Sequence, residues 1–340
     1  MRERVAPGSM AATPTIGLLG DVMLGRAVAE KLDSALAADV WSPDLREACR
    51  ACDALIVNLE CCVSVRGAPT ERIARKPFFF RSPPSAVTAL TAIGTSVASL
   101  ANNHTLDFGD EALIDTLLNL RAGGIASVGA DEEIAEARLG LVIQAGPLRL
   151  AVLALTDHPR EYEAGDARPG VAYADLRSGL PDWVRTELRR LRSQADLVLV
   201  FPHWGPNMTA RPARWQRQRA REFLTAGADA VAGHSAHVFH GVALTASGPV
   251  LYDLGGALDD YRIDKELRND LGVLALWRPH AEPEVELIGL RLGFCQTKLA
   301  VGADADWIAR RLERACGELG TAVRRLDEGR FALTPNCRTV

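Results

Sequence analysis

The sequence has little of what marks secreted, membrane-spanning or nucleic-acid-binding proteins. Its 340 residues contain seven cysteines, an odd number scattered through apolar or helical contexts, so we expect reduced thiols in the core rather than a disulfide framework. No stretch approaches the roughly 20 uninterrupted apolar residues that a membrane helix requires. The formal net charge of −4 argues against nucleic acid or an anionic membrane surface as a partner, because both attract basic faces.

The N-terminus also lacks the continuous apolar segment of a secretory signal. Such a signal needs a basic start followed by about 7 to 15 apolar residues, and here Pro7, Gly8 and Ser9 interrupt the run. We therefore expect a cytoplasmic protein without a membrane anchor. A flexible N-terminus over residues 1–12 would precede a single domain over residues 13–335.

What is present is an alternation of short apolar runs with segments of helical periodicity. The apolar runs are rich in β-branched residues, and the alternation predicts a mostly parallel sheet covered by helices. We expect these helices at residues 27–36, 43–51, 84–93, 110–122, 181–194 and 212–226.

After Gly140 the expected strands become shorter and are joined by tight turns. The turn Ala145-Gly146-Pro147 separates residues 141–144 from residues 148–155, which predicts a hairpin. Further elements are expected as antiparallel strands at 242–245, 250–254, 272–277 and 285–293, an amphipathic helix at 304–319 and an edge strand at 330–333. The whole pattern predicts an α/β protein with two packed sheets.

Six of the apolar runs end at polar side chains that could bind a metal ion. The run at residues 228–232 leads into Gly233-His234-Ser235-Ala236-His237, which places two imidazoles close together in the chain. The other five runs end at Asp21, at Glu60, at Asn103 with His104, at His158 and at His203. In open α/β sheets, ligands bind outside the carboxyl ends of the strands, so these side chains are expected to meet at one place.

Any one of these residues is explained as well by a helix cap or a hydrogen-bonded core group. Taken together, they favour a site for divalent metal ions. Carboxylate, amide and imidazole groups are a mixture of ligands that suits Mn, Zn, Fe or Ca.

Five motifs follow one another along the chain. They are Gly20-Asp21-Val22-Met23-Leu24-Gly25-Arg26, Asn58-Leu59-Glu60, Ala101-Asn102-Asn103-His104-Thr105-Leu106-Asp107-Phe108-Gly109, His203-Trp204-Gly205 and Gly233-His234-Ser235-Ala236-His237. In this order they resemble the motifs of the CapA family, which is named after the synthesis of capsular poly-γ-glutamate and has the calcineurin-like metallophosphatase fold. The resemblance covers roughly residues 15–260. It implies a four-layer α/β-β/α sandwich with a two-metal site at one end.

The resemblance also implies a role for each motif residue. Glu60 would bridge two metal ions. The remaining ligands would be Asn103, His203 and His234 for one ion, and Asp21 and His237 for the other. His104 would be an acid or base, steered by Asp107. Met23 departs from the Asp-x-His pair of ordinary metallophosphatases, because it stands where their histidine would be.

Further candidates adjoin or lie outside these roles. Arg75 and Lys76, with Arg81, resemble the family's Lys-Pro segment and could hold a substrate carboxylate or phosphate, although exposed loop charges explain them as well. Trp204 is counted with them as a candidate substrate contact. His158, which follows Asp157, is either a second acid or base or a histidine at the rim of the site.

The favoured function is that of a metal-dependent epimerase acting on a peptide. Some CapA-like proteins without an anchor epimerise ribosomally made peptides, including lasso-peptide precursors at their C-terminal residue, and the chain resembles them. His104 and His158 would be the two bases. The alternatives are a metal-dependent hydrolase of a phosphoester or of a peptide or γ-glutamyl amide bond, and a non-catalytic module that binds an acidic peptide or polymer. The oligomeric state stays open.

Overall fold

The computed structural model describes residues 13–34 and 37–336, and the fold is stated for these residues. The flexible segment expected at 1–12 lies outside them, and so does the end of the first expected helix, residues 35–36.

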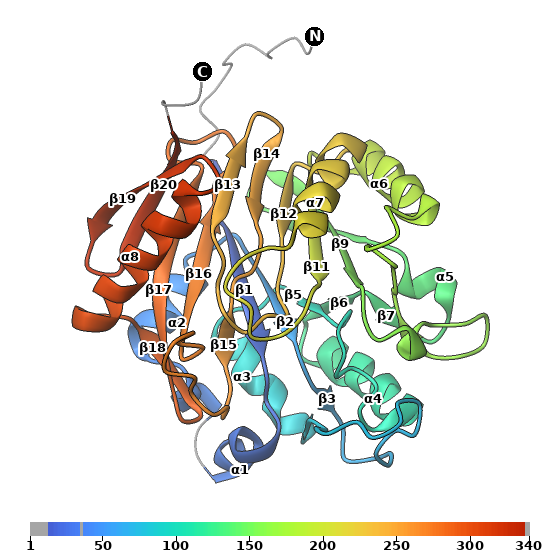
Figure 1. Cartoon of the computed structure of the whole chain (residues 1–340). Helices are drawn as coiled ribbons and strands as arrows, with labels where there is room; N and C mark the ends of the chain where they lie inside the picture. The colour runs from blue at the N-terminus through green and yellow to red at the C-terminus, as the bar shows by residue number, and fades with distance from the viewer. Residues whose placement is uncertain (1–12, 35–36, 337–340) are drawn as a thin grey trace.

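Among the described residues, the larger of the two main sheets has ten strands (Figure 1). Its parallel half contains β1 (Ile16–Val22), β2 (Ala54–Leu59), β5 (Val97–Ser99) and β6 (Ala126–Val128). On the other side of β1, the antiparallel half continues with β16 (Leu271–Trp277), β17 (Val285–Gly293), β20 (Arg330–Pro335) and β19 (Thr321–Asp327). Two further strands are β15 (Gly256–Leu258), which pairs with β1, and β18 (Gln296–Leu299), which pairs with β17.

The second main sheet has six strands within the described part of the chain. Its parallel centre consists of β9 (Leu148–Thr156), β11 (Leu197–His203), β12 (Ala230–Ala232) and β14 (Gly248–Leu251). The antiparallel strands β8 (Leu141–Ala145) and β13 (Val242–Thr245) form its edges. Two short pairs lie outside the sheets: β3 (Cys62–Val63) with β4 (Arg81–Ser82), and β7 (Ala130–Asp131) with β10 (Gly170–Val171).

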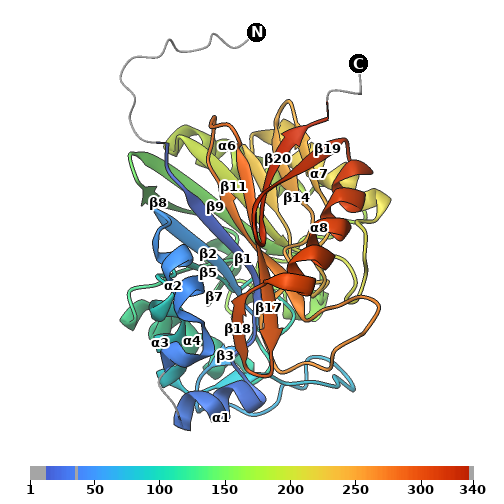
Figure 2. The same cartoon turned by 90° about the vertical axis from the view of Figure 1, so that its left-hand side faces the viewer.

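Most helices lie on the outer side of one of the two sheets (Figure 2). The larger sheet is covered by α1 (Arg26–Ser34), α2 (Pro43–Arg50), α3 (Val87–Ala92) and α4 (Gly109–Ala122). The second sheet is covered by α6 (Asp182–Gln194) and α7 (Arg214–Ala226). The remaining helices are α5 (Ile134–Ala137) and α8 (Gly302–Gly317), with short 3-10 turns at Ala37–Val40, Pro84–Ala86 and Arg160–Tyr162.

Three apolar clusters separate the four layers. Along β1, Leu19 belongs to the cluster under α1–α4, whereas its neighbour Leu18 belongs to the cluster between the sheets. Along β9, Val152 faces the space between the sheets and Leu153 faces α6 and α7. Because successive side chains of a strand point to opposite faces, both faces of both sheets are buried. The expected four-layer α/β-β/α sandwich is confirmed.

The structure changes several expectations about individual elements. The helix expected at 84–93 is divided into the 3-10 turn and α3. The strand expected at the edge from residue 330 is instead flanked on both sides, because β19 pairs beyond it. The strands β18 and β19 were not predicted from the apolar pattern. No helix among the described residues is long and apolar enough to cross a membrane.

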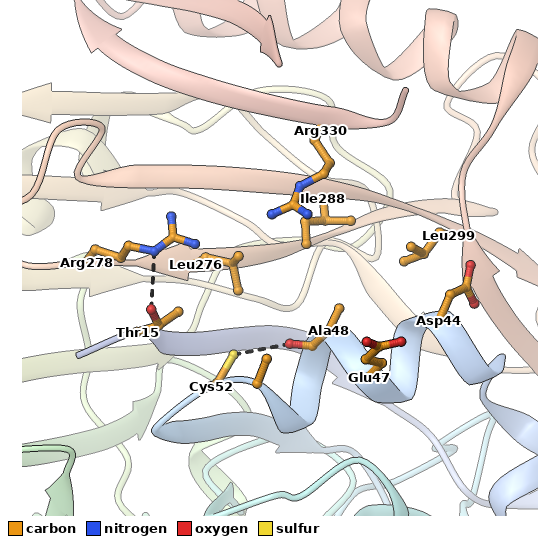
Figure 3. A pocket seen from close by; sticks show the side chains of 11 residues that line it. Thr15, Asp44, Glu47, Ala48, Cys52, Leu276, Arg278, Ile288, Leu299 and Arg330 are labelled. Carbon is orange, nitrogen blue, oxygen red and sulfur yellow. Dashed lines mark hydrogen bonds between the residues drawn. The ribbon is translucent and has the colours of Figure 1, made fainter. Parts of the chain in front are cut away.

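A cavity of about 380 Å³ lies between α2 and the antiparallel strands of the larger sheet. Figure 3 shows Arg278 and Arg330 on one side of it and Asp44 and Glu47 on the other. None of the candidate metal ligands lines this cavity. The candidate metal ligands lie instead at the carboxyl ends of the parallel strands.

Candidate metal centre

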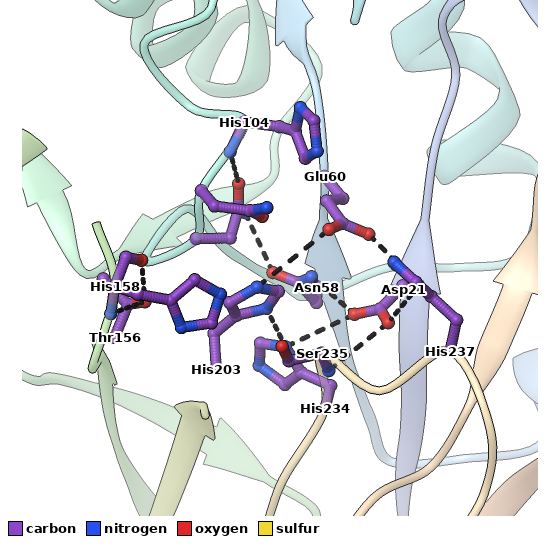
Figure 4. Close-up of polar contacts among 12 residues, drawn as sticks. Asp21, Asn58, Glu60, His104, Thr156, His158, His203, His234, Ser235 and His237 are labelled. Carbon is purple, nitrogen blue, oxygen red and sulfur yellow. Dashed lines mark hydrogen bonds and ion pairs between the residues drawn. The ribbon is translucent and has the colours of Figure 1, made fainter. Parts of the chain in front are cut away.

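Strand ends from both sheets bring the candidate ligands together. Asp21 lies near the end of β1 and Glu60 directly follows β2, both in the larger sheet. In the second sheet, His203 is the last residue of β11 and forms a parallel bridge with His234, which follows β12. Figure 4 shows these four side chains, with His237, pointing toward one another.

Their atoms form two overlapping groups, in each of which all candidate ligand atoms lie within 4.8 Å of one another. The groups are Asp21, His203 and His234, and Asp21, Glu60 and His237. Asp21 Oδ1 lies 3.4 Å from His234 Nδ1, and its Oδ2 lies 2.9 Å from His237 Nδ1. Glu60 Oε1 lies 4.0 Å from His203 Nε2, and its Oε2 lies 3.7 Å from His237 Nδ1. Both carboxylates therefore lie between the histidines of the two groups.

Several buried atoms at this centre have no hydrogen-bond partner in the part of the chain that the structure describes. They are both carboxylate oxygens of Glu60, Asn103 Oδ1, His203 Nε2 and His234 Nε2. Buried polar atoms are normally hydrogen-bonded, so a cluster of unpaired ones calls for a missing partner. Carboxylate, amide and imidazole atoms together are ligands for a divalent cation. The residues fit the expected metal ions, while the assignment of each ligand to one ion stays a prediction.

The electrostatics of the centre also favour a bound cation. Burial raises the pKa of Glu60 well above its usual value, and the nearby charge of Asp21 raises it further. Burial acts in the same direction on Asp21, but hydrogen bonds with His234 and His237 hold the pKa of that carboxyl well below its usual value. Burial, together with His234, lowers the pKa of His203, so its ring is neutral and can donate a lone pair. Two carboxylates this close are stabilised as anions by a cation between them.

The ligands are held by neighbours whose roles the sequence did not reveal. Asn58 Nδ2 donates to Asp21 Oδ1 over 2.8 Å, and Asn102 Nδ2 donates to Asn58 Oδ1 over 3.0 Å. Ser235 and His237 have φ angles of 118° and 56°, so the turn that carries both histidines is strained. Such outer contacts orient metal ligands. Asn58 and Asn102 belong to two of the five motifs, and this was the signal that could have identified them.

Met23 lies where ordinary metallophosphatases have a ligand histidine. Its side chain is fully buried in the cluster under α1–α4, and its sulfur accepts a hydrogen bond from the Gly25 N–H over 3.0 Å. The thioether therefore packs within the first motif.

His104 and Asp107 form a dyad beside the centre. His104 Nδ1 lies 2.6 Å from Asp107 Oδ2, and because a carboxylate can only accept, Nδ1 carries the proton and Nε2 is left as an acceptor. The imidazole stacks on Phe80 with ring centroids 4.1 Å apart. Burial lowers the pKa of His104 to about 4 despite the opposing effect of Asp107, so the ring is neutral at pH 7.

A second dyad lies on the His203 side of the centre. His158 Nδ1 is 2.5 Å from Asp157 Oδ1, and the His158 ring centroid is 5.1 Å from that of His203. Asp157 is itself held by the N–H of Gly205, 3.2 Å from Oδ2. A cavity of about 340 Å³, lined by Asn103, Asp157 and His158, opens beside it.

Three of the four residues predicted to bind substrate have other partners in the structure. Lys76 Nζ lies 3.2 Å from Asp107 Oδ1 and donates to the backbone oxygen of Asn103 over 2.8 Å, so it is buried beside the first dyad. Arg81 lies over the Phe108 ring, 4.1 Å from its centroid. Trp204 is fully buried under α7, and its Nε1–H donates a hydrogen bond to the backbone oxygen of Tyr252. None of these three residues, and not Arg75 either, lines the cavity beside His158 or a second cavity next to His104 and His237. Their role in substrate binding stays a prediction.

The second cavity beside the centre, of about 430 Å³, is lined mostly by residues that were not predicted to belong to the site. It contains His104 and His237 together with Arg26, Phe78, Phe80, Met208 and Tyr261. Arg26 closes the first motif, which was a signal for it, whereas Tyr261 lies in a loop after the last motif.

Comparisons with known proteins agree with this geometry. Residues 15–261 match the family model described as bacterial capsule synthesis protein PGA_cap. A probable polyglutamine synthesis accessory protein of Mycobacterium tuberculosis is 30% identical over 287 residues, covering 80% of this chain and 75% of that protein. The PGA biosynthesis protein CapA of Bacillus subtilis is 29% identical over 244 residues, covering 71% of this chain and 62% of that protein.

Solved structures give weaker likenesses. A novel phosphatase from Mycoplasma pneumoniae has a TM-score of 0.45 and 13% identity, covering 83% of this chain and 89% of that one. A putative 5′-nucleotidase from Staphylococcus aureus also has a TM-score of 0.45 and 13% identity, covering 88% of this chain and 58% of that one. Similarity at this level carries no inference about activity.

Proposed function

This chain belongs to the bacterial capsule synthesis protein family PGA_cap, and from that premise we propose that it is a metal-dependent epimerase of a peptide α-carbon. The candidate ligands are Asp21, Glu60, Asn103, His203, His234 and His237. When bound there, divalent ions would act as Lewis acids that polarise a substrate carbonyl. The peptide, its modification at the C-terminal residue, the single domain and the cytoplasmic location are parts of the same proposal.

The observation that carries this proposal is the presence of two His–Asp dyads beside one centre. His104 with Asp107 adjoins the cavity that also contains His237, whereas His158 with Asp157 adjoins His203. Figure 4 shows the two imidazoles on different sides of the ligand cluster. Inversion of a carbon centre needs one group that removes a proton and a second that returns a proton to the opposite face.

The protein's own groups supply these steps. His104 Nε2, the free acceptor of its ring, takes the α-proton, and the electron pair of the broken C–H bond moves onto the adjacent carbonyl. The protonated His158 ring then donates a proton to the other face, where the new C–H bond forms. Asp107 and Asp157 keep the two rings oriented, and proton exchange with solvent restores both histidines. Burial of His104 keeps its ring neutral and ready to accept.

A hydrolase is the second candidate, and the two overlapping ligand groups favour it. Sites with two adjacent metal ions are common in enzymes that hydrolyse phosphoesters and amides. His104 Nε2 would then accept a proton from the attacking water rather than from carbon. The substrate could be a phosphoester or a peptide or γ-glutamyl amide.

One experiment separates these functions. The metal-loaded protein is incubated with candidate peptides and with poly-γ-glutamate in heavy water, and the products are examined by mass spectrometry. An intact peptide heavier by about one mass unit at a single α-carbon is the result expected of an epimerase. Cleaved product without exchange in the uncut material would replace that proposal by the hydrolase. Binding without either change would favour a non-catalytic module.

A further inference from the structure

The 430 Å³ cavity beside the metal centre has a chemical character that the two dyads do not explain. His104 and His237 form part of its lining, so it opens directly on the candidate catalytic and ligand groups. Much of the rest is apolar and partly open to solvent: the Phe78 side chain is 57% exposed and Met208 is 37% exposed. Apolar groups that remain exposed in a concave site are a signal for a ligand.

Tyr261 contributes the least explained polar group of this cavity. Its ring lies edge-on to His237, with centroids 5.1 Å apart, and 5.8 Å from the Phe80 ring. The hydroxyl oxygen is buried and has no hydrogen-bond partner among the described residues. Tyr162 is also buried, yet its hydroxyl is 3.3 Å from Asp107 Oδ1. A buried phenol normally has such a partner, so the Tyr261 hydroxyl points to one that arrives with a ligand.

The cation nearest to this ring does not make the cavity an anion site. Arg26 lies over the rings of Phe80 and Tyr261, 5.0 and 5.3 Å from their centroids. Its guanidinium is paired with the Asp260 carboxylate, so its charge is already compensated. Arg262 is exposed at the lining and adds its charge at the solvent side. The inner part of the cavity is therefore suited to an uncharged apolar group.

A backbone hydrogen bond connects the loop that carries Met208 to the turn that carries His234 and His237. Met208 has a φ of 55°, and its N–H donates to the Ala236 oxygen, within the turn between the two histidines, over 2.9 Å. Asn207, the preceding residue, lines both this cavity and the polar cavity beside His158. A substrate at the metal centre can therefore extend into either side of this loop.

We propose that the aromatic cavity binds a large apolar side chain of the substrate, and that the Tyr261 hydroxyl donates a hydrogen bond to a substrate oxygen beside the reacting carbon. This assignment rests on the proposed function for the identity of the reacting carbon. The substrate class is thus a peptide whose modified residue is aromatic or large and aliphatic. Tyr261 becomes a further catalytic residue, because its proton faces the oxygen on which negative charge develops.

The test measures binding by calorimetry, with the metal-loaded protein and acetyl-Ala-Ala-X peptides in which X is Trp, Leu, Ser or Asp. Peptides with Trp or Leu are expected to bind at least about tenfold more tightly than those with Ser or Asp. The Phe78→Ser variant should remove most of this preference without unfolding the protein, because Phe78 is exposed. Equal affinity for all four peptides would overturn the assignment of the cavity.

Tyr261→Phe removes only the hydroxyl. It should weaken binding of the preferred peptide about fivefold, and where the peptide reacts, lower kcat by about a hundredfold with a smaller change in KM. The matched control is Tyr252→Phe. The Tyr252 ring packs on Trp204 in the outer layer of the second sheet. Metal content should be unchanged in both variants. An unaltered affinity and kcat in Tyr261→Phe would overturn its role.

Failure of the proposed function gives a different result. If peptides with Trp or Leu bind selectively but show neither exchange nor inversion, the epimerase is wrong and the cavity assignment holds. If exchange occurs equally with all four peptides, the epimerase holds and the cavity assignment is wrong.

Discussion

Two groups of buried carboxylates in this molecule have opposite surroundings. In the antiparallel half of the larger sheet, Asp270 pairs with Arg268 and Arg291, while Glu286 pairs with Arg278 and Arg330. At the metal centre, both oxygens of Glu60 lack a hydrogen-bond partner within residues 13–34 and 37–336. The Arg278 and Arg330 side chains that neutralise Glu286 are the two seen in Figure 3.

The difference separates a structural use of charge from a functional one. A buried carboxylate surrounded by guanidinium groups is satisfied within the protein, and breaking the pair leaves an uncompensated charge. A buried carboxylate whose oxygens lie beside histidines and another carboxylate is stabilised as an anion when a cation binds. Variants in the first region should therefore change the stability of the fold, and variants in the second should change metal content and turnover.

The largest effect is expected for His203→Ala at the metal centre. The variant should lose activity, and its metal affinity should fall by more than about a hundredfold, because even partners of a ligand are worth 10- to 100-fold. Metal content is measured by mass spectrometry of the dialysed protein. The matched control is His280→Ala, which changes an exposed histidine far along the chain. Intact metal stoichiometry in His203→Ala would disprove the ligand assignment.

His104→Ala tests whether the dyad acts in turnover rather than in metal binding. Loss of a positioned acid or base lowers kcat by roughly 10²- to 10⁴-fold. The metal content should match that of the unaltered protein, because His104 belongs to neither ligand group. Steady-state kinetics and metal analysis are measured on the same preparation. A variant that keeps its kcat would remove His104 from the mechanism.

Asp270→Ala tests the paired region and should change stability alone. Arg268 and Arg291 each lose one partner but keep the carboxylate of Asp304. Because both arginines are also about a quarter exposed, we expect the free energy of unfolding to fall by only about 1 to 2 kcal/mol. Urea denaturation gives this value, and metal content should stay constant. Arg325→Ala, which breaks the exposed pair with Asp306, should change stability by less than about 0.5 kcal/mol. Equal effects of the two variants would contradict the comparison.

The smallest effect is expected for Lys76→Met, because Lys76 forms a buried ion pair beside the metal centre. Lys76 contacts Asp107, the partner of His104, so its loss should lower kcat by about tenfold with little change in KM. Lys298→Met, at an exposed position of β18, is the control. A large rise in KM with constant kcat would instead support the substrate-binding role predicted from the sequence.

Much of the fold could be predicted because its strands are buried on both faces. Residues 16–19, 150–155 and 197–201 are continuous apolar runs, and the structure has strands at each of them. The strand β19 was missed because four of its seven residues are exposed and three of those four are charged, so it has no apolar pattern. Its pairing with β20 forms it, and that pairing is a contact between chain segments rather than a property of either one.

The structure brings some of the predicted site residues together and gives others different neighbours. Asp21, Glu60, His203 and His234 could be brought together in advance, because the carboxyl ends of parallel strands share one edge. Lys76 was assigned to the substrate because its segment resembles the family's Lys-Pro segment, and Trp204 was counted with it. The structure gives both side chains buried partners. Tyr261 was missed because a tyrosine in a loop carries no pattern, and only its unpaired hydroxyl makes it a candidate.

The layers, the order of the strands' polar ends and the family follow from the order of residues along the chain, because apolar periodicity and motif spacing are local properties. Which buried charges are paired depends on how distant segments pack. Asp270 and Glu60 are both buried acids, and nothing in their neighbouring residues shows that one meets two arginines and the other none. Those partners come from distant segments, and their positions depend on how the two sheets pack.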